Sequence, residues 1–183
     1  MKFTKLAMAT LFAASVVPFS SMAENTGVVN FKGTVVNSPC NIAQSSLNQT
    51  VDFGQLSRKA LESGNSAEEK FNIEFTGCDF DNYFTDGDGN AVAVNTMELV
   101  FTGQNYADAA NTMLATSTGN TNNLGIMIDG FEFGTAKDVL SRIENRVGDN
   151  TLTFTAVAKA VDANESVVEG TFSAISNFRI TYQ

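Results

Sequence analysis

The last fourteen residues of the chain alternate strictly enough to limit what the chain can fold into. Even positions are apolar or small and odd positions are mostly polar, the even set being Gly170, Phe172, Ala174, Ser176, Phe178, Ile180 and Tyr182. Successive side chains of a β-strand point to opposite faces, so this pattern predicts one long strand that reaches the end of the sequence. Strands average about 5–6 residues. A strand of this length in a core needs a neighbour on each side, and no residues follow it to supply one.

The same period of two recurs along the chain. Phe71, Ile73 and Phe75 alternate with polar residues, as do Leu152 and Phe154. Further strand candidates are residues 28–36, 51–56, 91–102 and 124–128, separated by clusters of Gly, Asn and Asp that are typical of turns. Two short stretches, residues 58–63 and 137–145, are expected to form helical turns. We therefore expect an all-β protein, an antiparallel β-sandwich in one domain.

The N-terminus has the three-part layout of a secretory signal peptide. Lys2 and Lys5 precede an apolar run over residues 6–17, and small residues, Ser21 and Ala23, stand three and one positions before the expected cleavage site. The apolar run is too short to span a bilayer of about 30 Å, and a buried N-terminal helix is the alternative. Cleavage after residue 23 leaves residues 24–183, and the formal charge changes from −9 to −11.

Export affects how the two cysteines are interpreted. In an oxidising compartment, Cys40 and Cys78 are expected to form a disulfide. Closing a loop of 38 residues should stabilise the fold by about 4 kcal/mol on the chain-entropy model. A metal site is the alternative, but the chain has no His and no further Cys to complete one.

Composition excludes several functions. With 11 basic against 20 acidic residues, the chain offers little attraction to nucleic acid or to anionic lipid. The absence of His excludes imidazole catalysis and imidazole metal ligands, and no nucleophile motif of the Ser-x-x-Lys or Gly-x-Ser-x-Gly type is present. Paired carboxylates are the remaining acid–base option. We expect no enzyme activity and no cofactor.

A short acidic run resembles the first half of a calcium-binding loop. It comprises residues 86–90, Asp-Gly-Asp-Gly-Asn. Ala91 stands where the EF-hand pattern requires Gly, and Met97 stands where it requires a bidentate Glu. A solvated turn between strands is therefore the main interpretation, and a weak surface calcium site is the alternative.

The expected mature protein opens with a second alternating segment. Gly27, Val29 and Phe31 alternate with Val28, Asn30 and Lys32, and no turn precedes them. This segment could form the first edge strand of its own domain. The other interpretation is a strand made for another molecule, because an open sheet edge and a free extended segment in one protein favour strand addition between copies.

These residues resemble the chaperone–usher pilins, and the major shaft subunits of type 1 and P fimbriae in particular. The resemblance rests on the run from Gly27 to Val36 leading to Pro39-Cys40, on Cys78 after a Phe-Asn-Ile strand, and on the C-terminal segment. In that segment Gly170 stands fourteenth from the end and Tyr182 is the penultimate aromatic, both as in the family's closing motif. The resemblance covers essentially residues 24–183.

The resemblance implies an incomplete immunoglobulin-like sandwich that lacks its final strand and is completed by a donor strand. Residues 24–36 would be the donor-strand extension, which runs into the first strand, and residues 37–183 the pilin domain. Gly27, Val29 and Phe31 would be the inserted donor residues. The acceptor edge and chaperone-recognition motif would comprise Gly170, Phe178, Ile180 and Tyr182. Implied partners are identical or related pilins, a periplasmic chaperone and an outer-membrane usher, and the implied location is a fimbria at the cell surface.

We therefore expect a structural subunit of an adhesive pilus shaft that polymerises head to tail by donor-strand exchange. The length leaves room for one domain, whereas tip adhesins of the family carry an additional receptor-binding domain. The alternative is a monomeric secreted β-sandwich that binds carbohydrate or protein through its loops. That alternative explains the export, the disulfide and the strands, but it leaves the unmatched last strand unexplained.

Overall fold

The computed structural model describes residues 27–183. The chain divides into two units, residues 1–35 and residues 36–183. The predicted signal peptide, residues 1–23, lies outside the described residues, as do residues 24–26 of the predicted donor extension.

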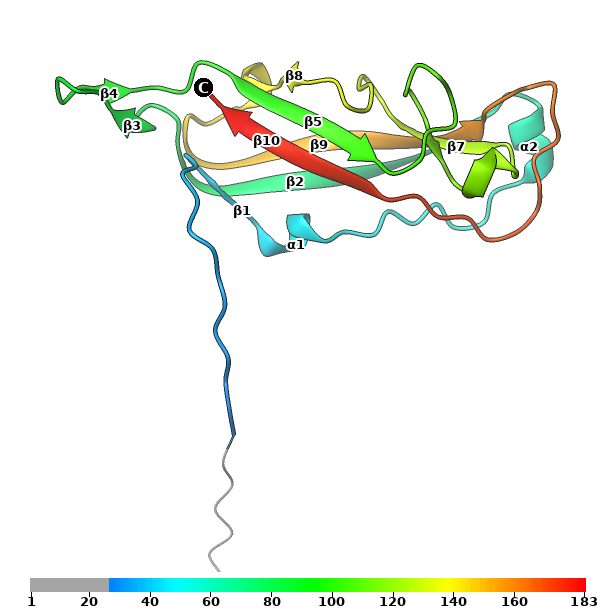
Figure 1. The fold of residues 1–183 in the computed structure, drawn as a ribbon, viewed down its shortest axis with the longest axis horizontal. Helices are drawn as coiled ribbons and strands as arrows, with labels where there is room; N and C mark the ends of the chain where they lie inside the picture. Colours follow the sequence, from blue (N-terminus) through cyan, green and yellow to red (C-terminus); the bar gives the residue numbers. More distant parts are fainter. Residues whose placement is uncertain (1–26) are drawn as a thin grey trace, which may run out of the picture. The chain divides into compact units, whose positions relative to one another are not determined.

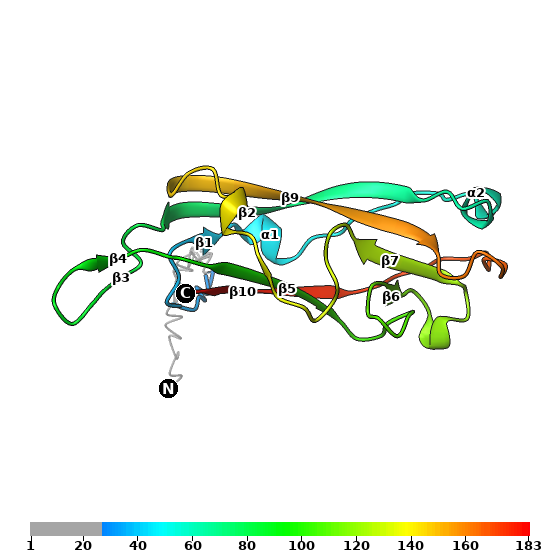
Figure 2. The same cartoon turned by 90° about the horizontal axis from the view of Figure 1, so that it is seen from above.

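Residues 36–183 form two facing antiparallel sheets and a small hairpin (Figures 1 and 2). The larger sheet has the order β1 (Asn41–Ile42), β2 (Ala67–Asp79), β9 (Val147–Ala160), β7 (Leu124–Ile128), β6 (Leu114–Ala115). The smaller sheet has the order β10 (Ser176–Tyr182), β5 (Met97–Gly103), β8 (Lys137–Asp138), and the hairpin comprises β3 (Phe84–Thr85) and β4 (Ala91–Val92). The short helices are α1 (Gln44–Leu47), α2 (Arg58–Glu62), η1 (Thr118–Asn120) and η2 (Leu140–Arg142). The predicted antiparallel β-sandwich is confirmed.

The long pair β2–β9 organises the larger sheet. Phe71 lies opposite Phe154, and Ile73 lies opposite Leu152. Opposite residues of an antiparallel pair project to the same face, so the alternation of both strands directs these side chains into one core. The register shifts between Phe75 and Cys78, where Gly77 adopts a φ of 59° that a side chain would disfavour.

The core between the two sheets is rich in phenylalanine. The Phe101 ring of β5 lies 5.4 Å from Phe154 and 5.1 Å from Phe131 in edge-to-face geometry, measured between ring centroids. Ile73 and Leu99 are fully buried beside them. These contacts join the smaller sheet, through β5, to the face of β2 and β9.

Several predicted elements agree with the structure. β7 has the predicted bounds, β2 and β9 contain the two alternating segments, and α2 occupies the first predicted helical turn. The predicted strand over residues 91–102 is instead two strands, β4 and β5, interrupted at residues 93–96. The second predicted helical turn, over residues 137–145, contains the short strand β8 and the single turn η2.

Three strand predictions were wrong, and the residues concerned that form no strand have no ladder partner within residues 27–183. The strand predicted over residues 170–183 is shorter, because β5 ends at Gly103 opposite Ser176 and no strand continues the ladder. Residues 51–56 are irregular, since the Asp52 carboxylate accepts the Gly54 N–H in a local turn. Residues 28–36 form no strand among the described residues.

Candidate strand-addition site

The site is the free edge of β10. In the sheet order β10 is terminal, and in residues 36–183 it pairs only with β5. Gln183 and Thr96 exchange two backbone hydrogen bonds, of 3.1 Å and 2.9 Å, at the end of this pair. Antiparallel ladders alternate with a period of two, so Asn177, Arg179 and Thr181 direct their N–H and C=O groups toward β5. The residues between them direct theirs to the other side.

The outward-directed backbone groups therefore belong to Ser176, Phe178, Ile180 and Tyr182. In the described part of the chain, the backbone N–H and C=O groups of these four residues have no hydrogen-bond partner on that side. Such a row of free donors and acceptors is a template for another strand.

The same edge carries apolar side chains that are only half covered. Phe178, Ile180 and Tyr182 pack against the main core cluster yet remain partly exposed, whereas the side chains of Asn177, Arg179 and Thr181 are solvent-exposed. The three predicted acceptor residues of β10 thus combine free backbone groups with incompletely buried apolar surface, and an added strand would cover both.

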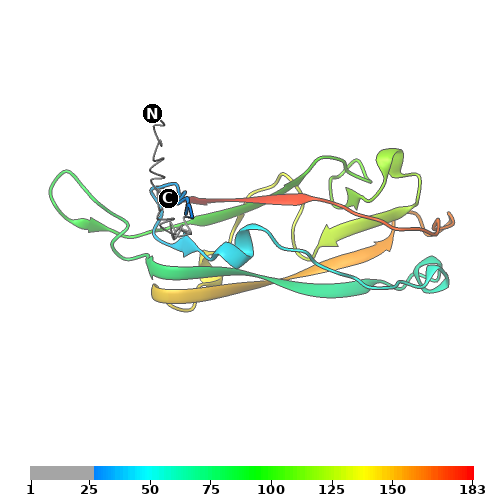
Figure 3. The same cartoon turned by 90° about the horizontal axis from the view of Figure 1, so that it is seen from below.

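Two parts of the chain border the half-covered core on this side of the sandwich (Figures 1 and 3). One is β10, and the other is the segment that follows β1. Ile42, Phe53 and Leu56 are also partly buried against the core, and the Phe53 ring lies 6.3 Å from that of Phe172. The role of these flanking residues is not predictable from the sequence pattern. The apolar residues Val51, Phe53 and Leu56 are the available signal, but their spacing predicts a strand.

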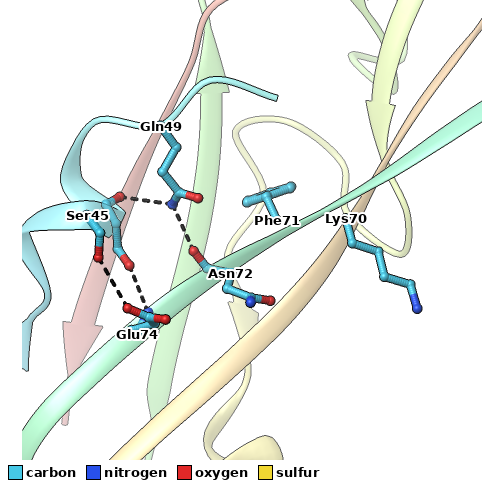
Figure 4. Close-up of a pocket in the computed structure, with 7 residues that line it drawn as sticks. Ser45, Gln49, Lys70, Phe71, Asn72 and Glu74 are labelled. Atoms are coloured by element: carbon cyan, nitrogen blue, oxygen red, sulfur yellow. Dashed lines mark hydrogen bonds between the residues drawn. The ribbon is translucent and has the colours of Figure 1, made fainter. Parts of the chain in front are cut away.

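The edge of β2, by contrast, is covered by side chains from that flank (Figure 4). Gln49 Nε2 donates to the Asn72 carbonyl at 2.8 Å, and Ser46 Oγ accepts the Glu74 N–H at 2.9 Å. A hollow of about 330 Å³ lies here, lined by Ser45, Ser46, Gln49, Lys70, Phe71, Asn72 and Glu74. These bonds occupy the outward-directed Asn72 carbonyl and Glu74 N–H, whereas all four outward-directed residues of β10 are free, so β10 offers the longer accessible edge.

Tyr182 anchors the end of β10 among aromatic rings. Its ring lies 6.2 Å from Phe80 and 6.3 Å from Tyr83, and its hydroxyl is buried without a hydrogen-bond partner among the described residues. Burial raises the pKa of Tyr182 above its ordinary value, and the nearby Ser38 hydroxyl, which donates to the Cys40 carbonyl and not to Tyr182, opposes that rise to a smaller extent.

Gly170, the remaining predicted acceptor residue, lies outside β10. It is exposed and precedes the strand by six residues, with a φ of 145° that only glycine adopts readily. A Cβ at this position would contact nothing within 4 Å, so the backbone conformation rather than space requires glycine here.

The three predicted donor residues, Gly27, Val29 and Phe31, belong to the unit that ends at residue 35. Val29 and Phe31 are 74% and 90% exposed, and no secondary structure is assigned to residues 27–35. Val28 and Val35 are similarly exposed, so apolar residues of both faces are uncovered. Exposed apolar side chains at this density are typical of a segment that binds another surface.

The predicted disulfide between Cys40 and Cys78 is confirmed. It ties the start of the folded unit to the end of β2, and the Asp79 N–H donates to the Pro39 carbonyl beside it at 2.8 Å. A segment that emerges before residue 36 is therefore attached to a firmly held end of the sandwich.

The acidic run at residues 86–90 forms the turn between β3 and β4. The Asp86 carboxylate accepts the N–H groups of Asp88 and Asn90, and these bonds lower its pKa, with Asn90 having the largest effect. Residues 27–183 contain no group of three His, Cys, Asp or Glu side chains placed to hold a metal ion. The same residues contain no helix long and apolar enough to cross a membrane.

Comparison with known proteins assigns the family. The model of the fimbrial protein family matches residues 29–183. The chain belongs to the fimbrial protein family. KS71A fimbrillin of Escherichia coli is 37% identical over 98% of this chain and 99% of its own, and the Pap fimbrial major pilin protein of the same organism is 35% identical over the same shares.

Solved structures of pilus subunits share the fold of this fimbrial protein. A subunit of a chaperone–usher pilus is 34% identical, with a TM-score of 0.71, over 89% of this chain and 99% of its own. The P pilus rod subunit PapA is 34% identical, with a TM-score of 0.63, over 80% of this chain and all of its own. The predicted incomplete immunoglobulin-like fold and the predicted role as a structural, non-enzymatic fimbrial subunit are confirmed.

Proposed function

We propose that this fimbrial protein is a pilus shaft subunit that polymerises by donor-strand exchange. The segment containing Gly27, Val29 and Phe31 of one subunit adds to the free edge of β10 in the next. The observation that carries the proposal is the coincidence, on Phe178, Ile180 and Tyr182, of free backbone groups and half-covered apolar side chains.

The strand pairings of the fold favour an antiparallel donor. Every pair of strands in residues 36–183 is antiparallel. With Gly27 opposite Tyr182, an antiparallel donor places Val29 opposite Ile180 and Phe31 opposite Phe178. Directly opposite residues share a face, so the apolar donor side chains enter the core that β10 leaves half covered.

The energetics support this arrangement. Burying the side chains of Val29 and Phe31 contributes roughly 1.5–3 kcal/mol each, and the ladder satisfies the free backbone groups of β10. Donor and acceptor are different surfaces of one protein, so the contact is head to tail and propagates into an open fibre.

Before assembly the free edge of β10 favours aggregation, because an unpaired strand beside apolar surface can pair with strands of other molecules. We propose that a periplasmic chaperone covers the edge, recognising Gly170, Phe178, Ile180 and Tyr182, and that an outer-membrane usher exchanges it for the next donor. The subunit would then pass through the periplasm to an adhesive fimbria at the cell surface. This route agrees with the predicted signal peptide.

The experiment uses a matched pair of donor substitutions. Phe31→Asp places a charge on an inserted side chain, whereas Lys32→Asp places the same charge on the neighbouring side chain that faces away. We expect Lys32→Asp to form ladders that resist SDS without heating and dissociate on boiling, and Phe31→Asp to form at most about a tenth as much polymer.

Deleting residues 24–32 is the complementary test. The shortened protein should still accept a synthetic donor peptide but should not donate to another subunit. Ladders formed by the shortened protein alone would contradict the proposal, and a stable monomer with no affinity for the peptide would favour the secreted binding module instead.

A further inference from the structure

Exposed large apolar side chains of the folded unit lie mainly in two regions of the chain. At the end where β2 terminates, the disulfide end, Phe84 is 48% exposed and Val147 is 63% exposed. In the segment between β9 and β10, which contacts α2 where the Val167 N–H donates to Glu62 at 3.3 Å and which we call the α2 end, Val168 is 58% exposed and Ile175, directly before β10, is 66% exposed. Val36 at the chain junction and Leu47 after α1 complete the set within residues 36–183. Two separate regions of exposed apolar side chains suit a molecule that contacts copies of itself through two different surfaces.

Phe84 lies on a hairpin that projects beyond the two sheets (Figures 1 and 2). The base of the hairpin is held by several contacts. The Tyr83 N–H donates to the Val92 carbonyl at 2.9 Å, and the Tyr83 ring lies near both Phe84 and Tyr182. Arg146 Nη2 donates to the carbonyls of Phe80 and Val94, at 3.2 Å each, beneath the hairpin. The half-exposed Phe84 ring is therefore presented on a supported element.

Chain length requires the two ends to approach each other in an assembled fibre. In the antiparallel register given above, Val35 of the donating subunit lies level with Ala174 of the accepting one. Cys40 follows five residues later, and an extended chain spans at most about 3.6 Å per residue, or about 18 Å in all. The disulfide between Cys40 and Cys78 fixes this point to the disulfide end. The disulfide end of the donor thus lies within about 18 Å of the start of β10 in the acceptor.

We propose that consecutive subunits make a second contact beyond the donor strand, between the disulfide end of one copy and the α2 end of the next. Phe84 and Val147 of the donating copy pack against Val168 and Ile175 of the accepting copy. This inference rests on the proposed function, since the antiparallel donor sets the distance. The occupant of each patch is a second copy of this chain.

The charges around the two regions are of both signs. Asp86 and Asp88 lie at the tip of the hairpin, but Arg146 beside Val147 is paired with Asp81, and Glu169 beside Val168 is paired with Arg58 at 3.5 Å. Neither region carries charge of one sign, so the proposed contact depends on burial of the apolar side chains.

Cysteine cross-linking in the assembled polymer tests the inference. Each subunit carries Phe84→Cys and Ile175→Cys, and a short bis-maleimide is added after assembly, when Cys40 and Cys78 are already bonded to each other. The control carries Thr153→Cys with Ile175→Cys, because Thr153 is exposed in the middle of β9, away from the disulfide end. We expect ladders that survive boiling in SDS from the first protein and not from the control.

The outcomes separate the two proposals. Both cysteine proteins could form ladders in SDS samples that are not heated, while the Phe84→Cys, Ile175→Cys protein gives no ladder after boiling. That result would overturn the second contact and leave donor-strand exchange standing. If neither the cysteine proteins nor the unsubstituted protein forms ladders in SDS samples that are not heated, both proposals fail. A Phe84→Ser variant checks the result without cross-linking: its ladders should form normally, and its fibres should bend at least about twice as readily in electron micrographs. Unchanged fibre stiffness would contradict the contact.

Discussion

At the scale of single residues, Tyr182 combines two roles that conflict energetically. Its ring completes an aromatic cluster with Phe80 and Tyr83 at the end of the acceptor edge. Its hydroxyl is buried without a hydrogen-bond partner among the described residues, which generally costs stability. The ring, rather than the hydroxyl, is therefore the part that supports the fold.

Replacing Tyr182 by Phe should keep the ring contacts and remove the buried hydroxyl. We expect the free energy of unfolding to rise by up to about 1 kcal/mol at neutral pH. Burial raises the folded-state pKa of Tyr182, so the unfolded chain loses the phenol proton first, at a pKa of about 10. The stability of the unsubstituted protein is therefore constant below that pH and falls as pH rises from there through the folded pKa.

Urea denaturation at pH 7 and between pH 10 and 11 measures both effects. The advantage of Tyr182→Phe over the unsubstituted protein should widen in alkali, and Tyr182→Ala, which also loses the ring, should be less stable at both pH values. A difference between Tyr182→Phe and the unsubstituted protein that stays constant with pH would show that the phenol is not buried.

At the scale of elements, the alternation along β10 determines which N–H groups of the donor strand can hydrogen-bond to β10. The outward groups of β10 belong to the residues whose side chains face the core, so an antiparallel donor must hydrogen-bond through its own core-facing residues. In a synthetic peptide of residues 24–37, N-methylation of Phe31 should block pairing with β10, whereas N-methylation of Asn30 should weaken binding much less. The expected loss is at least about tenfold in affinity.

Binding of each peptide to a protein that lacks residues 24–32 measures this difference by isothermal titration. N-methyl-Val29 should behave like N-methyl-Phe31, and N-methyl-Val28 like N-methyl-Asn30. Equal losses from all four peptides, or the opposite order, would contradict the pairing of the donor with β10.

The elements also show how far sequence alone predicts this molecule. Phe71, Ile73 and Phe154 alternate because one face of β2 and of β9 is buried, so these strands were predictable from local pattern. The predicted last strand was too long because its pairing stops where β5 ends, at Gly103, and this limit lies far away in the sequence. For the site, Phe178, Ile180 and Tyr182 were identified by their alternation. The covered edge of β2 was not, since it depends on Gln49 and Ser46 reaching strand residues more than twenty positions away.

At the scale of the whole molecule, the folded unit has an accessible edge that its own sheets leave unpaired. The half-covered residues Phe178, Ile180 and Phe53 lie over the same core that holds the fully buried Ile73 and Leu99. A bound donor strand stabilises the folded state without binding the unfolded one, so the subunit should be considerably more stable with a donor than alone.

A fusion protein tests completeness and donor direction together. Residues 24–36 are moved from the N-terminus to follow Gln183 through a turn of about four residues, within the usual range for hairpins. An antiparallel donor can start beside Tyr182 and run back along β10, whereas a parallel donor would first have to cross the length of the strand, about 23 Å. We therefore expect a monomer that forms no ladders and melts at least about 10 °C higher than the same protein without the added strand. The matched control carries Phe31→Asp within the moved segment and should lose most of that gain. If the fusion protein melts no higher than its control, the donor does not pair antiparallel with β10. A fusion protein that gains stability only with a linker long enough to span β10 would show a parallel donor.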